Sequence, residues 1–278
     1  QLTDLGFDFD GLQTGYPGGE PDWHYVKDLA GLTEKDLLKS FSKNGKATVK
    51  KANTFGIKLK RLERDQLSIF KDITAATSDR REYDDKPLDY YQDFYDSFGQ
   101  QADFMTASLN FKDYLQNLQK DQEKLGQKIQ KLQADLENNP QSEKKQNQLR
   151  ELSSFETRKA EAQELIDKYG DQDQILAASL FIYTPQEATY LFSGSYPEFN
   201  KFYAPALLQE YVMTESIKRG IPFYNFLGIM GIFDGSDGVL RFKQNFNGFI
   251  VRKMGTFCYY PNPLKFKLLQ LIKKILRR

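Results

Sequence analysis

The longest regular pattern of apolar positions runs through the middle of the chain and predicts a pair of helices. Apolar residues recur there at alternating spacings of three and four, which is typical of a coiled-coil helix. They are Phe111, Leu115, Leu118, Leu125, Ile129, Leu132 and Leu136, with Gln122 at the one polar core position. After the interruption ENNPQSEKK, a second run has apolar positions at Leu149, Leu152, Phe155, Ala162, Ile166 and Tyr169. We therefore predict an antiparallel helical hairpin, a coiled-coil arm over residues 108–170, with about 25 to 30 residues in each helix.

Strand and helix patterns alternate on both sides of this arm. Before it, the segments DWHYVKDL and IKLKRL read as strands around a helix that starts at Thr33, breaks near Gly45 and stops at Gly56. After it come two strands, ILAASLFIYT and EATYLFSGS, then the helix APALLQEYVMTESIKRG and the strand FYNFLGI. This order is that of the second half of an acetyltransferase-like fold. The predicted fold class is α/β (α+β): an acetyltransferase-like (GNAT) subdomain, built from residues 1–107 and 171–262, with the arm inserted.

One lysine stands in a stretch that otherwise looks like core. The segment is GVLRFKQNFNGFI, residues 238–250, and it is too irregular for a simple amphipathic helix. Lysine is rarely fully buried unless it is paired. We therefore expect the Lys243 ammonium either to reach back to water or to face an anion.

The last residues, 263–278, read as a basic amphipathic helix that starts at Pro263. Its apolar positions are Leu264, Leu268, Leu271, Ile272 and Ile275, while Lys267, Lys274 and Arg278 fall on another face. Such a helix can lie on an anionic membrane surface. It can equally pack its apolar face against another part of the protein.

Charge is strongly segregated along the chain, although the net charge is only +1. Residues 39–64 hold nine Lys or Arg and one acid, and residues 241–278 hold ten Lys or Arg and no acid. Between them, residues 79–103 hold eight acids against three basic residues. Basic segments of this kind suggest polyanion binding. The alternative is that solvated faces of opposite charge neutralise each other in the fold.

Few residue types for nucleophilic or metal chemistry are present. The chain has one cysteine, Cys258, and one histidine, His24, within 278 residues. An internal disulfide is excluded, which suits a reducing compartment such as the cytosol. A zinc site needs more Cys and His ligands, and we expect His24 to be a packed residue rather than half of a catalytic pair. Without an initiator methionine, a signal peptide or an apolar run that could span a bilayer, the sequence is expected to be a piece of a longer cytoplasmic protein.

The segments YLFSGSYPEFNKFYAPALLQEYVMTESIKRGIPFYNFLGI and GVLRFKQNFNGFIVRKMGTFCYYPNPL, with the inserted arm and the early DWHYVKDL, resemble the Fem family of peptidoglycan bridge-forming aminoacyltransferases. The likeness is strongest to the streptococcal type and covers nearly the whole chain. Members of this family have two acetyltransferase-like subdomains. The resemblance implies that this chain is the second of them and that the first is absent, which leaves open whether the chain is active alone.

The resemblance implies transfer of an amino acid from aminoacyl-tRNA to the stem-peptide lysine of a peptidoglycan precursor, either lipid II or a UDP-linked muropeptide, at the inner face of the plasma membrane. Independently, the acetyltransferase pyrophosphate loop R/Q-x-x-G-x-G/A is missing, which argues against acetyl-CoA as donor. A ribose ester is already activated, so that positioning and oxyanion stabilisation suffice and no metal or cofactor is required. The alternative is a non-catalytic tRNA-binding or scaffold module that recruits a partner through its arm.

The family pattern also implies roles for particular residues. A Phe-Lys pair lines the transfer site in the family, and Phe242-Lys243 matches it. A fixed ammonium beside an aromatic ring suits tRNA phosphates, a terminal base and a tetrahedral oxyanion. The alternative is a lysine with a buried stem and an exposed head. In the basic segment, Lys46, Lys50 and Lys51 are the candidates for contact with tRNA.

Four further residues are candidates for holding the precursor. Relatives place a basic residue four positions before a tyrosine, and Lys86 and Tyr90 have this spacing, with lysine in place of the arginine of some members. Phe192 stands where some relatives carry a substrate-binding tyrosine, which puts that contact in doubt. Tyr203 or Tyr196 could supply the hydroxyl instead, with structural roles as the alternative.

Overall fold

The computed structural model describes residues 1–16, 21–136 and 143–276, and within them the chain forms two compact units. The larger unit comprises residues 27–225 with 245–247, and the smaller one the remaining segments. The chain passes from one to the other within strands β2 (Trp23–Asp28) and β7 (Phe223–Gly228) and on either side of residues 245–247.

The larger unit is built on a mixed sheet with the order β3-β4-β5-β6-β7. Neighbours are antiparallel except β6 and β7, which are parallel. Its strands besides β7 are β3 (Lys58–Arg61), β4 (Ala102–Asn110), β5 (Asp173–Tyr183) and β6 (Glu187–Ser195). Its helices are α1 (Glu34–Ser40), α2 (Lys43–Asn53), α3 (Leu67–Arg81), α4 (Leu88–Phe98), α5 (Phe111–Leu136), α6 (Glu143–Tyr169) and α7 (Ala204–Lys218), with 3-10 turns at Arg64–Gln66, Gly99–Gln101 and Pro197–Phe202. The predicted mixed α/β class is confirmed, while its acetyltransferase-like character stays a prediction.

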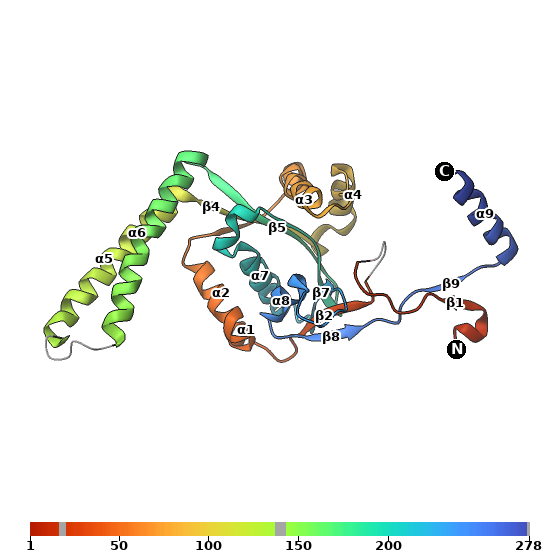
Figure 1. The fold of residues 1–278 in the computed structure, drawn as a ribbon, viewed down its shortest axis with the longest axis horizontal. Helices are drawn as coiled ribbons and strands as arrows, with labels where there is room; N and C mark the ends of the chain where they lie inside the picture. Colours follow the sequence, from red (N-terminus) through yellow and green to blue (C-terminus); the bar gives the residue numbers. More distant parts are fainter. Residues whose placement is uncertain (17–20, 137–142, 277–278) are drawn as a thin grey trace. The chain divides into compact units, whose positions relative to one another are not determined.

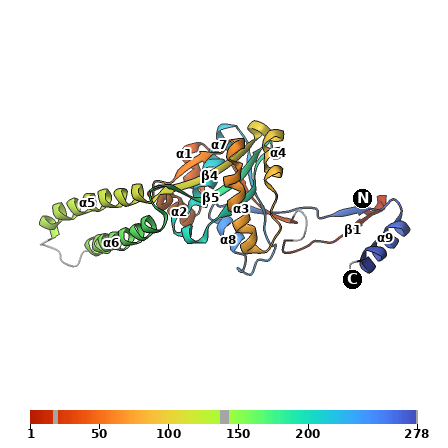
Figure 2. The ribbon, with the colours of Figure 1, turned by 90° about the horizontal axis from the view of Figure 1, so that it is seen from above.

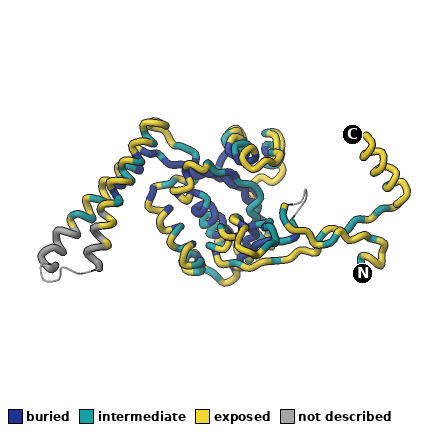
Figure 3. The backbone as a smooth tube through the Cα atoms, viewed as in Figure 1, coloured by how far each residue is buried: buried dark blue, intermediate teal, exposed yellow. Residues whose placement is uncertain are grey.

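Helices cover both faces of this sheet. Figure 1 shows α3 and α4 on one face and α1, α2 and α7 on the other, and Figure 3 shows the buried residues gathered between these layers. Strand β6 passes close beneath α3 at Gly194, where a Cβ would lie 2.5 Å from the Ile73 carbonyl oxygen. The glycine of the SGS sequence is therefore required for close packing of helix on sheet.

The basic helix of the first block is broken earlier than predicted. It forms α1 and α2, which are separated at Phe41 and Ser42 rather than near Gly45, because the Ser42 hydroxyl caps α2 by accepting from the Gly45 amide at 3.0 Å. Gly45 has another purpose. A Cβ there would lie 1.9 Å from the Asn245 carbonyl oxygen, so that only glycine lets residues 245–247 approach α2.

The predicted arm corresponds to helices α5 and α6, which lie side by side in both views (Figures 1 and 2). Gln122 bonds across the pair, donating to Glu156 and accepting from Lys159 at 2.9 Å. Leu118 and Ala162 are buried, whereas Ile129, Leu132, Leu136, Leu149 and Leu152 have side chains outside the described residues. The arm starts at Phe111 rather than at residue 108, because β4 runs to Asn110. Coiled-coil packing stays a prediction.

The smaller unit consists of two antiparallel strand pairs and two helices. Strand β2 pairs with β8, and β1 pairs with β9. Besides the parts of β2 and β7, its elements are the 3-10 turn Thr3–Leu5, β1 (Phe7–Phe9), α8 (Gly238–Gln244), β8 (Phe249–Arg252), β9 (Phe257–Tyr259) and α9 (Pro263–Leu276). The predicted helix start at Pro263 is confirmed. Among the described residues, no helix combines the length and apolar character needed to cross a membrane.

Candidate active site

Lys243 lies on α8, a helix of seven residues, and the segment 238–250 then continues into strand β8, so that it does not form one amphipathic helix. Asp237 fixes the start of α8. Its Oδ1 accepts from the amides of Val239 at 2.8 Å and Leu240 at 3.1 Å, and its Oδ2 accepts from the Met230 amide at 3.0 Å. An aspartate in this place is a favourable N-cap, and it ties the loop after β7 to the helix that carries Lys243.

The Lys243 ammonium is turned toward the backbone at the end of β7, so that contact with a bound anion stays a prediction. The residue is 4% exposed, and its Nζ donates to the carbonyl oxygens of Gly228 at 2.6 Å and Leu227 at 3.2 Å. Backbone carbonyls at the end of β7 therefore take the place of solvent. Burial lowers the pKa of Lys243 to about 7, against a smaller opposing effect of the Asp237 charge.

The end of β7 has an unusual backbone, which explains why its carbonyls meet the lysine. Leu227 has φ of 58°, in the left-handed region that non-glycine residues rarely adopt. Gly228 follows it, and a Cβ there would lie 2.4 Å from Cγ of Pro21. The ammonium thus sits at a crowded and strained turn. A charge buried in such a place acts on a neighbouring charge more strongly than one in water.

Phe242, His24 and Cys258 are the other residues of the smaller unit that the sequence singled out, and all three are at least half-buried. Phe242 is half-buried on α8 beside Lys243. His24 is 2% exposed within β2, as expected of a packed residue. Cys258 is half-buried in β9 as a free thiol. No group of three or more His, Cys, Asp or Glu side chains in the described part of the chain could hold a metal ion.

Three of the four predicted precursor-binding residues come together in the larger unit. The Lys86 ammonium lies 5.6 Å from the centre of the Tyr90 ring, within the range of a cation–π contact. The Tyr90 ring meets Phe192 of β6 edge-on, with centroids 6.2 Å apart. Lys86 and Tyr90 are both exposed, so that a cation and an aromatic edge face solvent at the start of α4.

Tyr203 lies elsewhere. It precedes α7, with φ of 56°, and the Lys51 ammonium stands 5.3 Å from its ring centre. Helices α7 and α2 cover the sheet face opposite to α3 and α4 (Figure 1), so that Tyr203 is not grouped with Lys86. Tyr196, the other tyrosine considered, packs against the same core cluster as Phe192.

The predicted tRNA-binding lysines lie on one helix. Lys46, Lys50 and Lys51 belong to α2, where Lys50 and Lys51 are exposed and Lys46 is half-buried. The Lys46 ammonium donates to the carbonyl oxygen of Lys39 at 3.2 Å. Gly45 brings this helix against Asn245, which follows Lys243 by two positions in the chain.

Two aspartates of the site were missed by sequence reasoning. Asp85 belongs to the loop that carries Lys86 and accepts a hydrogen bond from the Lys86 amide, and Asp237 accepts from amides at the start of α8. Asp237 had a detectable signal, because an aspartate before the apolar run VLRF is a typical helix start. Asp85 had none, since it stands in a run of acids and looks like its neighbour Asp84.

Comparison with known proteins shows the family of the chain. Residues 1–274 match the model of the FemAB family. The aminoacyltransferases FemA of Staphylococcus epidermidis RP62A and Staphylococcus aureus MRSA252 are 26% and 27% identical to the chain, and the alignments cover 99% of it and 68% and 67% of those proteins. The crystal structure of FemX superimposes with a TM-score of 0.72 at 22% identity, covering 96% of this chain and 69% of that one. The relatives are named as aminoacyltransferases, and this chain is accordingly a transferase. Because the family model covers nearly its whole length, the chain belongs to the FemAB family.

Proposed function

We propose that this protein transfers an amino acid from aminoacyl-tRNA to the stem-peptide lysine of a peptidoglycan precursor, and so contributes to an interpeptide bridge. The observation that carries the proposal is the family match over residues 1–274 together with the buried ammonium of Lys243 on α8. The acceptor is lipid II or a UDP-linked muropeptide, and the setting is the cytoplasmic face of the plasma membrane. No cofactor is needed.

The chemistry requires little besides positioning and charge. The lysine amine of the acceptor attacks the ester carbonyl of the donor, a C–N bond forms, and the ribose oxygen leaves with its electron pair and takes up a proton. Charge develops on the carbonyl oxygen in the tetrahedral state. In its protonated form, the Lys243 side chain, held by Leu227 and Gly228, supplies a positive charge for that oxyanion in a site of low dielectric constant.

The acceptor site is proposed at the start of α4. Lys86 offers a cation to the pyrophosphate of the precursor, and the exposed ring of Tyr90 offers a contact surface beside it. Lysine binds phosphate as a point charge, without the forked geometry of arginine.

A direct test compares acyl donors. Radiolabelled amino acid should pass from a charged tRNA to the precursor, whereas a label carried on acetyl-CoA should not. Equal transfer from acetyl-CoA would overturn the donor assignment, and binding of tRNA without any transfer would favour the scaffold alternative.

The α2 lysines predict how tRNA binding depends on salt. If Lys46, Lys50 and Lys51 contact phosphates, replacing all three by glutamine should flatten the plot of log affinity against log salt by about three units at most. Filter binding between low and moderate salt measures the slope. The matched control replaces three exposed lysines on other elements, Lys60, Lys218 and Lys253. A slope equally flat in both variants would show that these are solvated lysines and that the tRNA binds elsewhere.

Helix α9 is proposed to contact the membrane. Its apolar residues are exposed, among them Leu264 at 80% and Ile275 at 63%, and Figure 3 shows the helix exposed along its length. Cations near an anionic surface contribute about 1 kcal/mol each. The alternative is that another part of the protein covers this apolar surface.

Vesicle flotation separates the two alternatives for α9. The protein should float with anionic vesicles at low salt, float less at high salt and lose binding when residues after Pro263 are removed. A protein that stays unbound at low salt, and unfolds when α9 is deleted, would show that α9 is a packing element instead.

A further inference from the structure

One side chain of the loop between α3 and α4, residues 82–87, is held by hydrogen bonds from both helices. The residues of the loop are exposed except Asp85, which is half-buried with a side-chain exposure of 9%. This loop carries Lys86 and leads directly into the first turn of α4, where Tyr90 lies. What holds Asp85 therefore decides where Lys86 stands.

Both oxygens of the Asp85 carboxylate accept hydrogen bonds. Oδ2 accepts from the Lys71 ammonium, and it lies 3.1 Å from the Thr74 hydroxyl, whose one proton is shared with the Lys71 carbonyl at 3.0 Å. Oδ1 accepts from the Tyr91 hydroxyl and from the Lys86 amide, each at 2.9 Å. The carboxylate is therefore held on both of its oxygens by groups of the protein itself.

These donors come from three places that need to be held together. Lys71 and Thr74 fix the carboxylate to α3, Tyr91 fixes it to α4, and the Lys86 amide fixes the loop itself. Burial alone would raise the pKa of Asp85, yet the hydrogen bonds outweigh it and the pKa lies below its usual range. The charged, acceptor-only form is therefore the one that binds all of the donors.

We infer that Asp85 is a positioning residue for the precursor site: it fixes the backbone of Lys86 and the start of α4, so that the Lys86 ammonium and the Tyr90 ring present one arrangement to the substrate. The role of Lys86 in this inference rests on the proposed function. A flexible loop would have to be ordered when the precursor binds, and that cost would weaken binding. Asp85 removes the cost in advance.

The test uses Asp85→Asn, which keeps the size but removes the charge and half of the acceptor capacity. We expect the KM for the precursor to rise about tenfold with kcat nearly unchanged, and the amides of residues 83–90 to exchange hydrogen faster. Asp84→Asn, the same change at the exposed neighbour, should leave both unchanged. If Asp85→Asn folds poorly, Tyr91→Phe serves as the test instead. It removes one of the donors to Asp85 while keeping the buried ring, and it should raise the KM for the precursor about twofold to threefold.

A second comparison separates this inference from the proposed function. If Asp85 acts through Lys86, then Asp85→Asn should raise the KM little further in a Lys86→Met background. An equal further rise there, or a KM that responds to Lys86→Met but not to Asp85→Asn, would overturn the inference while the precursor site stands. A KM for the precursor that does not respond to Lys86→Met overturns the proposed precursor site. In that case, faster hydrogen exchange in Asp85→Asn still shows that this carboxylate fixes the loop. Unchanged exchange would show that it does not.

Discussion

Replacing Lys243 by methionine should slow aminoacyl transfer by about 100-fold or more, equivalent to about 3 kcal/mol of transition-state stabilisation. Methionine fills a similar volume without a charge, so that the oxyanion loses the fixed ammonium that Leu227 and Gly228 hold in place. Single-turnover rates with charged tRNA and precursor measure the loss. The matched control is Lys253→Met, the same change at an exposed lysine of the smaller unit, and it should react at the normal rate.

Loss of the fold must be separated from loss of the charge. Without the ammonium, the carbonyls of Leu227 and Gly228 each lose one hydrogen bond, at a cost of about 1 kcal/mol each, which the removal of a buried charge partly offsets. The pH dependence of unfolding reports on the charge itself. Because the pKa is about 7 in the folded state and 10.5 ordinarily, the unfolded chain binds more protons between these values, and stability should rise with pH across them. Lys243→Met should lose this rise. Normal turnover in the variant would remove Lys243 from the mechanism.

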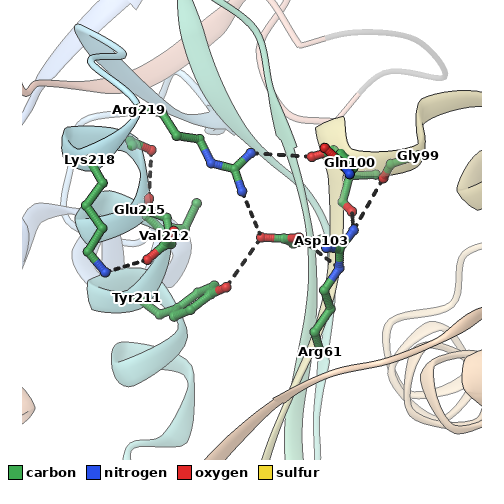
Figure 4. Close-up of polar contacts among 11 residues, drawn as sticks. Arg61, Gly99, Gln100, Asp103, Tyr211, Val212, Glu215, Lys218 and Arg219 are labelled. Carbon is green, nitrogen blue, oxygen red and sulfur yellow. Dashed lines mark hydrogen bonds and ion pairs between the residues drawn. The ribbon is translucent and has the colours of Figure 1, made fainter.

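Replacing Asp103 by alanine should lower the free energy of unfolding by about 3 kcal/mol, the largest stability change we expect from one side chain. Asp103 lies on β4 with a side-chain exposure of 2%, between Arg61 at 3.1 Å and Arg219 at 3.8 Å (Figure 4). The Tyr211 hydroxyl donates to the same carboxylate at 3.4 Å. The variant leaves two guanidinium groups beside a buried surface without their partner.

The stability loss expected for Asp103→Ala depends on how deeply the ion pair is buried, and the exposed pair of Asp96 with Arg64 serves as the comparison. The arginines are 38% and 36% exposed, so that water can partly replace Asp103, which keeps the loss toward the low end for a buried pair. Asp96→Ala breaks an ion pair with Arg64 in which both side chains are 50% exposed, and it should cost less than about 1 kcal/mol. Urea unfolding of both variants measures the difference. Equal losses would mean that the Asp103 cluster is as well hydrated as the surface pair.

Apolar runs that end at turn residues could be predicted from the sequence, as between β5 and β6 at Pro185 and after α7 at Gly220. Strands β5 and β6 and helix α7 matched their predicted segments closely. Strand β4 was missed because the polar residues Asp103, Thr106 and Ser108 interrupt its apolar run although their side chains are buried. Helix α3 was missed because its buried face carries threonine and serine beside leucine and phenylalanine, which hides the helical period.

For the candidate site, the residues could be predicted from the sequence, whereas their surroundings could not. Residue types and spacing, with the family resemblance, pointed to Lys243, Lys86 and Tyr90. The surroundings of Lys243 could not be predicted, because they consist of backbone carbonyls at a strained turn of β7. The grouping of Tyr203 with Lys51 instead of Lys86 depends on which sheet face each helix covers, and a single sequence does not encode that in its local pattern.

The mass of the acceptor after reaction tests the central claim most directly. The protein is incubated with a pool of charged tRNAs and with lipid II or UDP-linked muropeptide, and the product is weighed and fragmented by mass spectrometry. We predict that the precursor gains the mass of one amino acid on its stem-peptide lysine, only when the tRNA is charged. A precursor that stays unchanged with every charged tRNA and both acceptor forms, under conditions in which tRNA is bound, would contradict the account and leave a binding or scaffold role.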